Sequence, residues 1–133
     1  MSLLATLTII LSLQSAPSAA DILQGLDMTS FRNSTGPSRA TGLRRPSDWS
    51  FSRLAVEGGR ASLERSENEW VIGLRIIRRT PDGVIGCFSD RAQNGGNYDA
   101  QKPIWIVRDD LGGYLVVDED IVEAGCSPRP GQG

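Results

Sequence analysis

The sequence predicts an all-β fold: a small antiparallel meander of about six strands, closed as a barrel or folded as a sandwich, with an irregular N-terminal arm and one disulfide. Two observations predict the strands. From residue 48 onward, apolar residues recur with a period of two in short runs, and tight-turn residues separate these runs. No run outside the first twenty residues has the period of an amphipathic helix.

The expected strands are defined by where apolar residues alternate and where turn residues interrupt them. They comprise residues 49–56, 60–65, 69–80, 84–89, 104–108 and 114–118. In the strongest run, 69–80, one face of the strand carries Trp70, Ile72, Leu74 and Ile76. The segments between the runs include Gly58-Gly59, Pro81-Asp82-Gly83 and residues 109–113, all with the composition of tight turns. Each strand is therefore expected to pair with the next.

The first twenty residues have the composition of an export signal. Residues 3–13 form an apolar run that is shorter than the roughly 20 residues a membrane-spanning helix requires. Ser18 and Ala20 place small side chains at positions −3 and −1 of a cleavage site before Asp21. We therefore predict a signal peptide at residues 1–20, with an uncleaved anchor as the alternative. The protein is expected to be periplasmic or secreted, with no membrane span once the signal is removed.

Composition divides the remaining chain into three parts. Residues 21–47 are rich in Ser, Thr, Gly, Pro and Arg, which predicts an N-terminal arm or extended loop. Within it we expect a helical turn at 21–26 and a strand near 28–33. Residues 48–126 form the β domain. Residues 127–133 include two Pro and two Gly, which predicts a flexible tail.

The two cysteines, Cys87 and Cys126, predict one disulfide. An even cysteine count in an exported chain is typical of a disulfide, and closing this loop should stabilise the fold by about 3–4 kcal/mol. The alternative is a catalytic thiol at Cys87. The chain has no histidine, the usual base beside such a thiol, so Cys–His and Ser–His catalysis and most zinc sites are excluded.

The charge balance argues against nucleic acid as a partner. The chain carries 14 basic and 16 acidic residues, a net charge of −2, whereas proteins that bind polyanions usually carry a basic excess. The balance is uneven along the chain, since residues 21–80 are rich in Arg and residues 81–133 are rich in Asp and Glu. The two halves can attract each other within one molecule, or present different faces to a partner.

Five residues are candidates for binding an anionic partner. Arg guanidinium groups suit carboxylates and phosphates. Two of the four candidate arginines precede a tryptophan, and the other two form a second basic group on one strand. The candidates are Arg44, Arg45, Trp49, Arg75 and Arg79. The alternative interpretation is that these arginines pair with the acidic C-terminal half of the same chain. We expect no cofactor and no metal site.

Two further clusters of polar residues have weaker functional interpretations. Asp90, Asn94, Asn97 and Asp99 surround Gly95-Gly96 and form an oxygen-rich loop of the kind that calcium favours, but their spacing matches no known calcium loop and such residues also favour turns. The hairpin at residues 109–120 carries five carboxylates, which is the residue type of a glycosidase site and also of a solvated strand end.

These features predict a non-enzymatic protein that works by non-covalent binding. We expect an envelope-associated or inhibitor-like interaction module, whose partner is an envelope or extracellular protein or an anionic surface. Two alternatives stay open: a small hydrolase that uses carboxylates of the C-terminal hairpin, and a barrel that carries a small apolar ligand.

Overall fold

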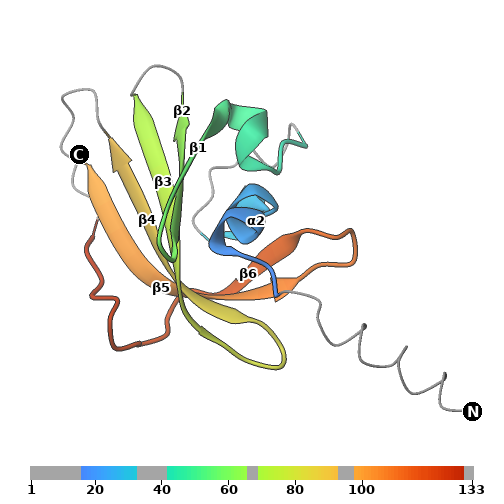
Figure 1. Ribbon diagram of the computed structural model, residues 1–133, viewed down its shortest axis with the longest axis vertical. Helices are drawn as coiled ribbons and strands as arrows, with labels where there is room; N and C mark the ends of the chain where they lie inside the picture. Colours follow the sequence, from blue (N-terminus) through green and yellow to red (C-terminus); the bar gives the residue numbers. More distant parts are fainter. Residues whose placement is uncertain (1–15, 33–41, 66–68, 93–97, 131–133) are drawn as a thin grey trace, which may run out of the picture.

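The fold is built on one antiparallel sheet. A computed structural model describes residues 16–32, 42–65, 69–92 and 98–130. Within these residues, six strands follow one another across the sheet in the order β1-β2-β3-β4-β5-β6 (Figure 1). Their bounds are β1 (Phe51–Glu57), β2 (Arg60–Arg65), β3 (Trp70–Arg79), β4 (Val84–Ala92), β5 (Asp99–Arg108) and β6 (Tyr114–Asp118). The predicted six-stranded antiparallel meander is confirmed.

Alternation along the strands produces the core face of the sheet. Leu63 of β2 lies opposite Ile72 of β3, and Ala61 lies opposite Leu74. All four side chains are at most 2% exposed. Because side chains in a strand point alternately to the two faces, these residues share the face expected from the sequence.

The sheet is strongly curved, and helix α2 (Ala19–Gln24) lies on its concave side (Figure 1). Ser18 caps the helix: its hydroxyl accepts from the backbone N–H of Asp21 at 3.1 Å, and the Asp21 carboxylate accepts from Ser18 N–H at 3.0 Å. Ile22 and Leu23 are fully buried against the strands. A helix of six residues is too short to be stable alone, so this packing holds it in place.

The predicted N-terminal arm contributes more to the core than its composition indicates. Ile22, Leu23, Leu26 and Phe31 all belong to the main cluster of buried residues. The strand expected near residues 28–33 is absent from the described part, where a 3₁₀ helix, η1 (Met28–Ser30), stands instead. Asp27 favours this turn because its carboxylate accepts from the backbone N–H of Thr29 at 2.9 Å. Residues 33–41 lie outside the described residues.

The sheet is a single open layer, so neither the barrel nor the sandwich is completed. β1 and β6 are the two edges of the sheet, and no ladder joins them within the described ranges. α2 and the residues after it occupy the concave side that a second sheet or a closed barrel would otherwise fill. A second short 3₁₀ helix, η2 (Pro46–Trp49), leads into β1.

The predicted cleavage site before Asp21 falls inside α2. Cleavage there would remove the Ser18 cap and Ala19, while Ile22 and Leu23 would remain on the concave face. Residues 1–15 lie outside the described residues. Among the helices of the described residues, none is long and apolar enough to cross a membrane.

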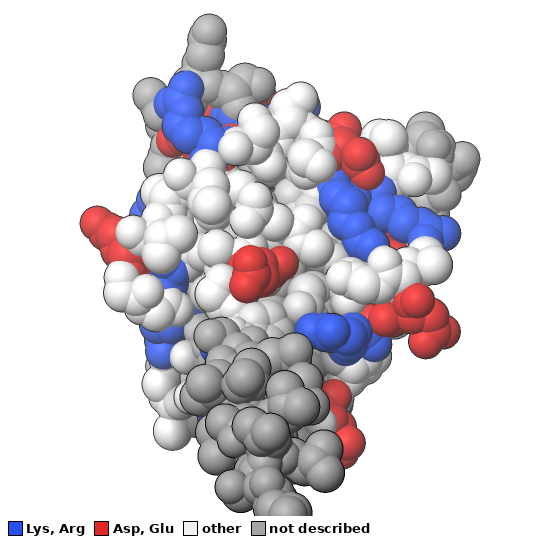
Figure 2. All heavy atoms as spheres, turned by 45° about the vertical axis from the view of Figure 1, so that its right-hand side comes forward, with Lys and Arg blue, Asp and Glu red and all other residues white. Residues whose placement is uncertain are grey.

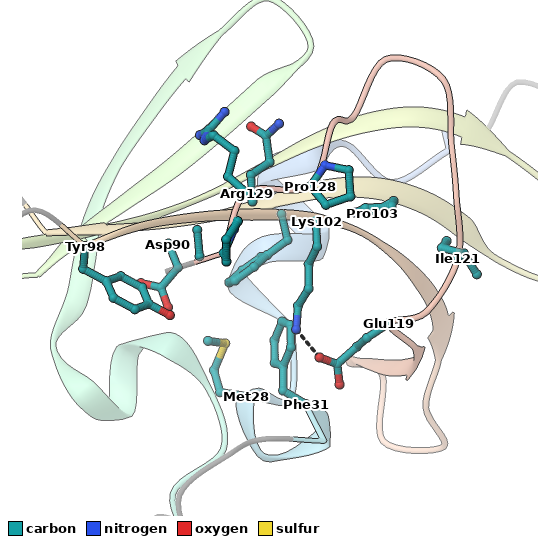
Figure 3. A pocket seen from close by; sticks show the side chains of 14 residues that line it. Met28, Phe31, Asp90, Tyr98, Lys102, Pro103, Glu119, Ile121, Pro128 and Arg129 are labelled. Carbon is teal, nitrogen blue, oxygen red and sulfur yellow. Dashed lines mark hydrogen bonds and ion pairs between the residues drawn. The ribbon is translucent and has the colours of Figure 1, made fainter. Parts of the chain in front are cut away.

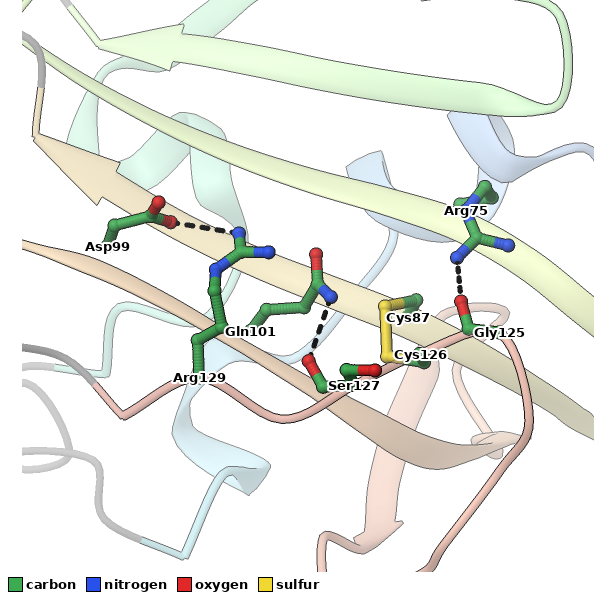
Figure 4. Close-up of a disulfide and its surroundings, with 8 residues drawn as sticks. All are labelled: Arg75, Cys87, Asp99, Gln101, Gly125, Cys126, Ser127 and Arg129. Carbon is green, nitrogen blue, oxygen red and sulfur yellow. Dashed lines mark hydrogen bonds and ion pairs between the residues drawn. A yellow bond between two sulfur atoms is a disulfide. The ribbon is translucent and has the colours of Figure 1, made fainter.

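The predicted disulfide joins Cys87 of β4 to Cys126, with the two Cα atoms 5.6 Å apart (Figure 4). Both cysteines are 1% exposed. The disulfide brings the C-terminal segment beside β5, where Gln101 and Arg129 exchange backbone hydrogen bonds of 2.8 and 2.9 Å. β6 pairs only with residues 105–108 of β5, so the segment after Cys126 covers a part of β5 that β6 leaves open. Ser127 and Arg129 of the predicted tail are therefore hydrogen-bonded to β5.

Candidate functional site

A cavity of about 630 Å³ lies where β6 ends and the C-terminal segment crosses β5 (Figure 3). This volume is within the range of small-ligand sites. The concave face of the sheet contributes Phe88, Asp90, Ala100 and Lys102, while η1 and the residue after it contribute Met28 and Phe31. The remaining lining residues come from β5, the turn before it and the chain after β6: Tyr98, Gln101, Pro103, Glu119, Ile121, Pro128, Arg129 and Pro130.

Aromatic rings form the apolar part of the cavity. The rings of Phe31 and Phe88 are 4.7 Å apart between centroids, and both residues are at least nine-tenths buried. Tyr98 packs against Trp70 with ring centroids 5.5 Å apart. Because these rings are packed against neighbours, the apolar surface of the cavity is largely formed before a ligand binds.

An ion pair between Lys102 and Glu119 closes one side of the cavity (Figure 3). The Glu119 side chain is 5% exposed and also accepts a hydrogen bond from the backbone N–H of Arg32. The Lys102 Nζ lies 5.6 Å from the centroid of the Phe31 ring, within the range of a cation–π contact. Glu119 therefore neutralises Lys102 and holds its amino group against the aromatic part of the cavity.

Asp90 supplies a carboxyl group on the other side of the cavity, beside Tyr98 (Figure 3). Burial raises the pKa of Asp90, while a hydrogen bond from the Trp70 indole N–H and the positive charge of Lys102 act in the opposite direction. Burial and the nearby Asp90 charge also raise the pKa of Tyr98. Within the described residues, no Lys or Arg lies within ion-pair distance of Asp90.

The segment after Cys126 forms one rim of the cavity. Pro128, Arg129 and Pro130 line it, and Arg129 is fixed by its backbone bonds to Gln101 and by an ion pair with Asp99 at 3.0 Å (Figure 4). The Gln101 amide donates to the Ser127 carbonyl at 3.0 Å. The shape of the cavity therefore depends on the disulfide that positions this segment.

None of the five binding residues predicted from sequence lines this cavity. Arg44 is exposed, Trp49 is half-buried in η2, and Arg79 is exposed at the end of β3. Arg75 donates to the backbone carbonyl of Gly125 beside the disulfide (Figure 4). The structure places Arg44 and Arg45 just before η2, Trp49 at its end, and the other two arginines on β3, and it does not gather them around the cavity.

Arg45 is committed to contacts within the molecule. Its guanidinium donates to the Gly25 carbonyl at 2.6 Å and lies 3.5 Å from the Asp109 carboxylate. Arg78 likewise holds Glu123 at 2.8 Å. These pairs support the alternative given above, in which arginines pair with the acidic C-terminal half. On the face shown in Figure 2, basic and acidic side chains are interspersed and form no large patch of one sign.

The carboxylates of the C-terminal hairpin hold the local backbone in place. Asp109 accepts from the backbone N–H groups of Leu111 and Gly113, at 2.8 and 2.7 Å, and these bonds hold the pKa of Asp109 below its usual value. Asp118 accepts from the backbone N–H of Asp120 at 2.8 Å. Arg32 binds Asp120 at 2.7 Å and lowers the pKa of that carboxyl. These contacts are typical of carboxylates with a structural role.

The residues of the suggested calcium loop lie on different faces where they are described. Asp90 pairs with Ala100 and Arg91 with Asp99 in the β4–β5 ladder, so Asp90 and Asp99 point to opposite sides of the sheet. Asn94 and Asn97 lie outside the described residues. Among the described residues, no group of three or more metal-binding side chains is present.

Sequence reasoning missed the cavity although it had singled out two of its residues, Asp90 and Glu119, for other roles. Lys102 was the available signal, because a lysine on the face that also carries Ile104 and Ile106 must find an acidic partner.

Scans against protein-family models and searches of curated proteins and solved structures found no match to this chain.

Proposed function

We propose that the protein is an exported binding domain whose ligand site is the cavity between β5, η1 and the C-terminal segment. The observation that carries the proposal is the cavity lining, which combines packed aromatic rings with fixed charged groups. Such a combination is typical of sites that bind a small ligand or one side chain of a partner protein. The signal-like sequence of residues 1–20 and the buried disulfide support export to a periplasmic or extracellular compartment.

The charges of the cavity favour a ligand that has an apolar body and one positive group. Lys102 is paired with Glu119, and Arg129 is paired with Asp99. Asp90 receives a hydrogen bond from Trp70 and is influenced by the charge of Lys102, but no Lys or Arg among the described residues lies within ion-pair distance of it, so its carboxylate can still pair with a cation. A ligand ammonium or guanidinium group would pair with Asp90 and lie beside the Tyr98 ring, where cation–π attraction adds to the ion pair.

Binding is favoured over hydrolysis by the roles of the carboxylates. Asp109 stabilises a turn, and Glu119 and Asp120 each form an ion pair. Because these contacts occupy the three carboxylates, none of them is available to act with a second carboxylate in catalysis. The chain also has no histidine to serve as a general base. The cavity, in which Asp90 has no ion-pair partner among the described residues, therefore supports recognition of a ligand rather than its cleavage.

A titration with matched probes tests this function. Phenethylammonium is the cationic probe, and 2-phenylethanol is a neutral probe of similar shape; binding is followed by backbone NMR shifts of residues that line the cavity. The cationic probe is expected to bind at least tenfold more tightly, because only its ammonium group can pair with Asp90. A tenfold ratio corresponds to about 1.4 kcal/mol of binding free energy. Tripeptides centred on lysine, arginine or glutamine then distinguish a small organic cation from a side chain of a partner protein.

Two variants with the same change of charge provide the control. Asp90→Asn should weaken binding of phenethylammonium at least tenfold, whereas Asp110→Asn, an exposed turn residue, should leave it within twofold. Binding should also weaken as the pH falls and Asp90 takes up its proton, because a neutral carboxyl no longer attracts the cation. Equal affinities for the two probes, or equal effects of the two variants, would rule out Asp90 as the recognition group.

A further inference from the structure

The two edges of the sheet are treated differently by the rest of the chain. The outer edge of β6 is hydrogen-bonded to the N-terminal segment: Tyr114 N–H donates to the Gly25 carbonyl at 2.9 Å, and Asp27 N–H donates to the Tyr114 carbonyl at 2.7 Å. Val116 N–H donates to the Ser30 hydroxyl at 2.9 Å. β1, by contrast, pairs only with β2 within the described ranges, and six of its seven residues are exposed (Figure 1).

The β1–β2 turn determines which backbone groups of β1 face this open edge. Glu57 pairs with Arg60 across the two-residue turn Gly58-Gly59, and Gly58 has φ of 59°, which suits the first central position of a type II′ hairpin turn. The residues that flank such a turn exchange hydrogen bonds, and bonding then alternates along the strand. The N–H and C=O groups of Leu54 and Val56 therefore point away from β2.

The side chains of β1 leave the edge accessible for pairing. Leu54 and Val56 are 41% and 58% exposed and lie on the same face as the buried Leu63 and Ala61, their partners in β2. No proline interrupts Phe51–Glu57. Natural edge strands are usually protected by proline, bulges or charged side chains. In β1 the bulge at Ser52 leaves residues 53–57 regular, and the two charges, Arg53 and Glu57, are of opposite sign.

We propose that β1 pairs antiparallel with β1 of a second copy of this chain, about a two-fold axis at Ala55. In this register Leu54 lies opposite Val56 of the other copy, and these residues carry the backbone groups that point outward. Arg53 then lies opposite Glu57 of the other copy, on the other face of the sheet. At the axis the two Ala55 residues face each other, and their small side chains suit the close approach of a pair without hydrogen bonds.

Charge complementarity selects this register over its neighbours. A two-fold axis at Leu54 or at Val56 would place Arg53 or Glu57 opposite an uncharged residue, and registers shifted by one residue would set outward-facing groups against inward-facing ones. In the Ala55 register, two Arg53–Glu57 pairs form, one on each side of the axis. Arg53 is 65% exposed while it holds Glu64 at 2.8 Å, so Glu57 of the second copy would join an existing ion pair.

One pair of strands buries little surface, so the expected dimer is weak, with a Kd on the order of 10–100 μM. Sedimentation of the purified full-length protein between about 10 μM and 1 mM measures it. The dimer does not involve the cavity, so its failure would leave ligand binding at Asp90 untouched, and Asp90→Asn should dimerise normally.

Charge reversal provides the decisive test. Arg53→Glu places two glutamates opposite each other and Glu57→Arg places two arginines opposite each other, so each variant alone should dimerise at least tenfold more weakly. An equimolar mixture of the two variants should form heterodimers with affinity near that of the wild type, because each opposing pair is then of opposite sign. Thermal melting checks that both variants fold.

A second variant tests the backbone register. With Ala55→Cys, the two-fold axis brings the new thiols together, so mild oxidation should yield a covalent dimer, whereas the change Val117→Cys, at an exposed side chain of the covered strand β6, should yield little. The proposal is overturned by a wild-type protein that stays monomeric at 1 mM, by variants that dimerise as well as the wild type, or by a mixture that does not associate.

Discussion

Removal of the Cys87–Cys126 disulfide is expected to lower stability strongly, and its size can be worked out from the loop that it closes. The two cysteines are 39 residues apart in sequence, so the loop contains about 40 residues. The chain-entropy relation gives about 13 cal/mol/K for a loop of this length, or about 4 kcal/mol at 25 °C. For a domain of roughly 100 residues, each kcal/mol shifts the melting temperature by about 4 °C. We therefore expect reduction to lower Tm by roughly 15 °C.

The assay compares three samples by calorimetry and circular dichroism: oxidised protein, protein reduced with a phosphine, and the double variant Cys87→Ala/Cys126→Ala. The reduced protein and the double variant should both melt well below the oxidised protein. The reductant should have no effect on the double variant, which controls for effects unrelated to the disulfide. Ligand affinity should also fall on reduction, because Pro128 to Pro130 form a rim of the cavity.

Two results would refute the reasoning. The first is a fall in Tm below about 4 °C, which would correspond to less than about 1 kcal/mol and would mean that the loop is already constrained by other contacts. The second is the detection of two free thiols in denatured protein that was purified without reductant, since cysteines joined in a disulfide have no free thiol.

Three further predictions test particular contacts. Leu23→Ala should lower the free energy of unfolding by about 2–5 kcal/mol in urea, whereas a loss under about 0.5 kcal/mol would place α2 outside the core. Arg45→Ala should cost about 1.5–3 kcal/mol because it removes the charged donor of the Gly25 carbonyl, which keeps only its bond from the Tyr114 N–H; the exposed Arg44→Ala should change stability by at most about 0.5 kcal/mol, and equal losses would contradict the contact. Burial raises the pKa of Asp90 in the folded protein. Asp90 therefore favours folding at a pH below its unfolded-state pKa, which is about 3.9, and this contribution is lost as the pH rises through its folded-state pKa. Asp90→Asn should therefore be more stable than the wild type at pH 7, with the gap closing below about pH 4 in denaturation curves; a gap that does not change with pH would show that burial of the charge is not its cause.

The sheet was predictable because alternation is a local property of the sequence. Trp70, Ile72 and Leu74 indicate a strand and its buried face without knowledge of any other segment. Turns such as Gly58-Gly59 are equally local. The bounds of β2 and β6 agree with the expected ranges, whereas β5 begins five residues earlier than expected, at Asp99, since Gln101 and Lys102 join the ladder through their backbone.

The cavity was less predictable because its residues are far apart in the chain. Met28 and Arg129 both line it, and nothing local in either segment indicates that they lie near β5. Asp90 and Lys102 are ordinary polar residues in sequence, and they become distinctive only because the curved sheet buries one and pairs the other with Glu119.

The sequence by itself determined the six strands, their order of pairing and the disulfide, because each depends on period-two alternation, on turn residues or on the presence of just two cysteines in the chain. Only the tertiary structure decided that Ile22 and Leu23 fill the concave side, that the N-terminal segment covers β6 while no other described segment pairs with the outer edge of β1, and that the C-terminal segment completes the cavity. The physical reason is that these features arise from contacts between distant segments, whose apolar and polar residues are too few to identify their partners locally.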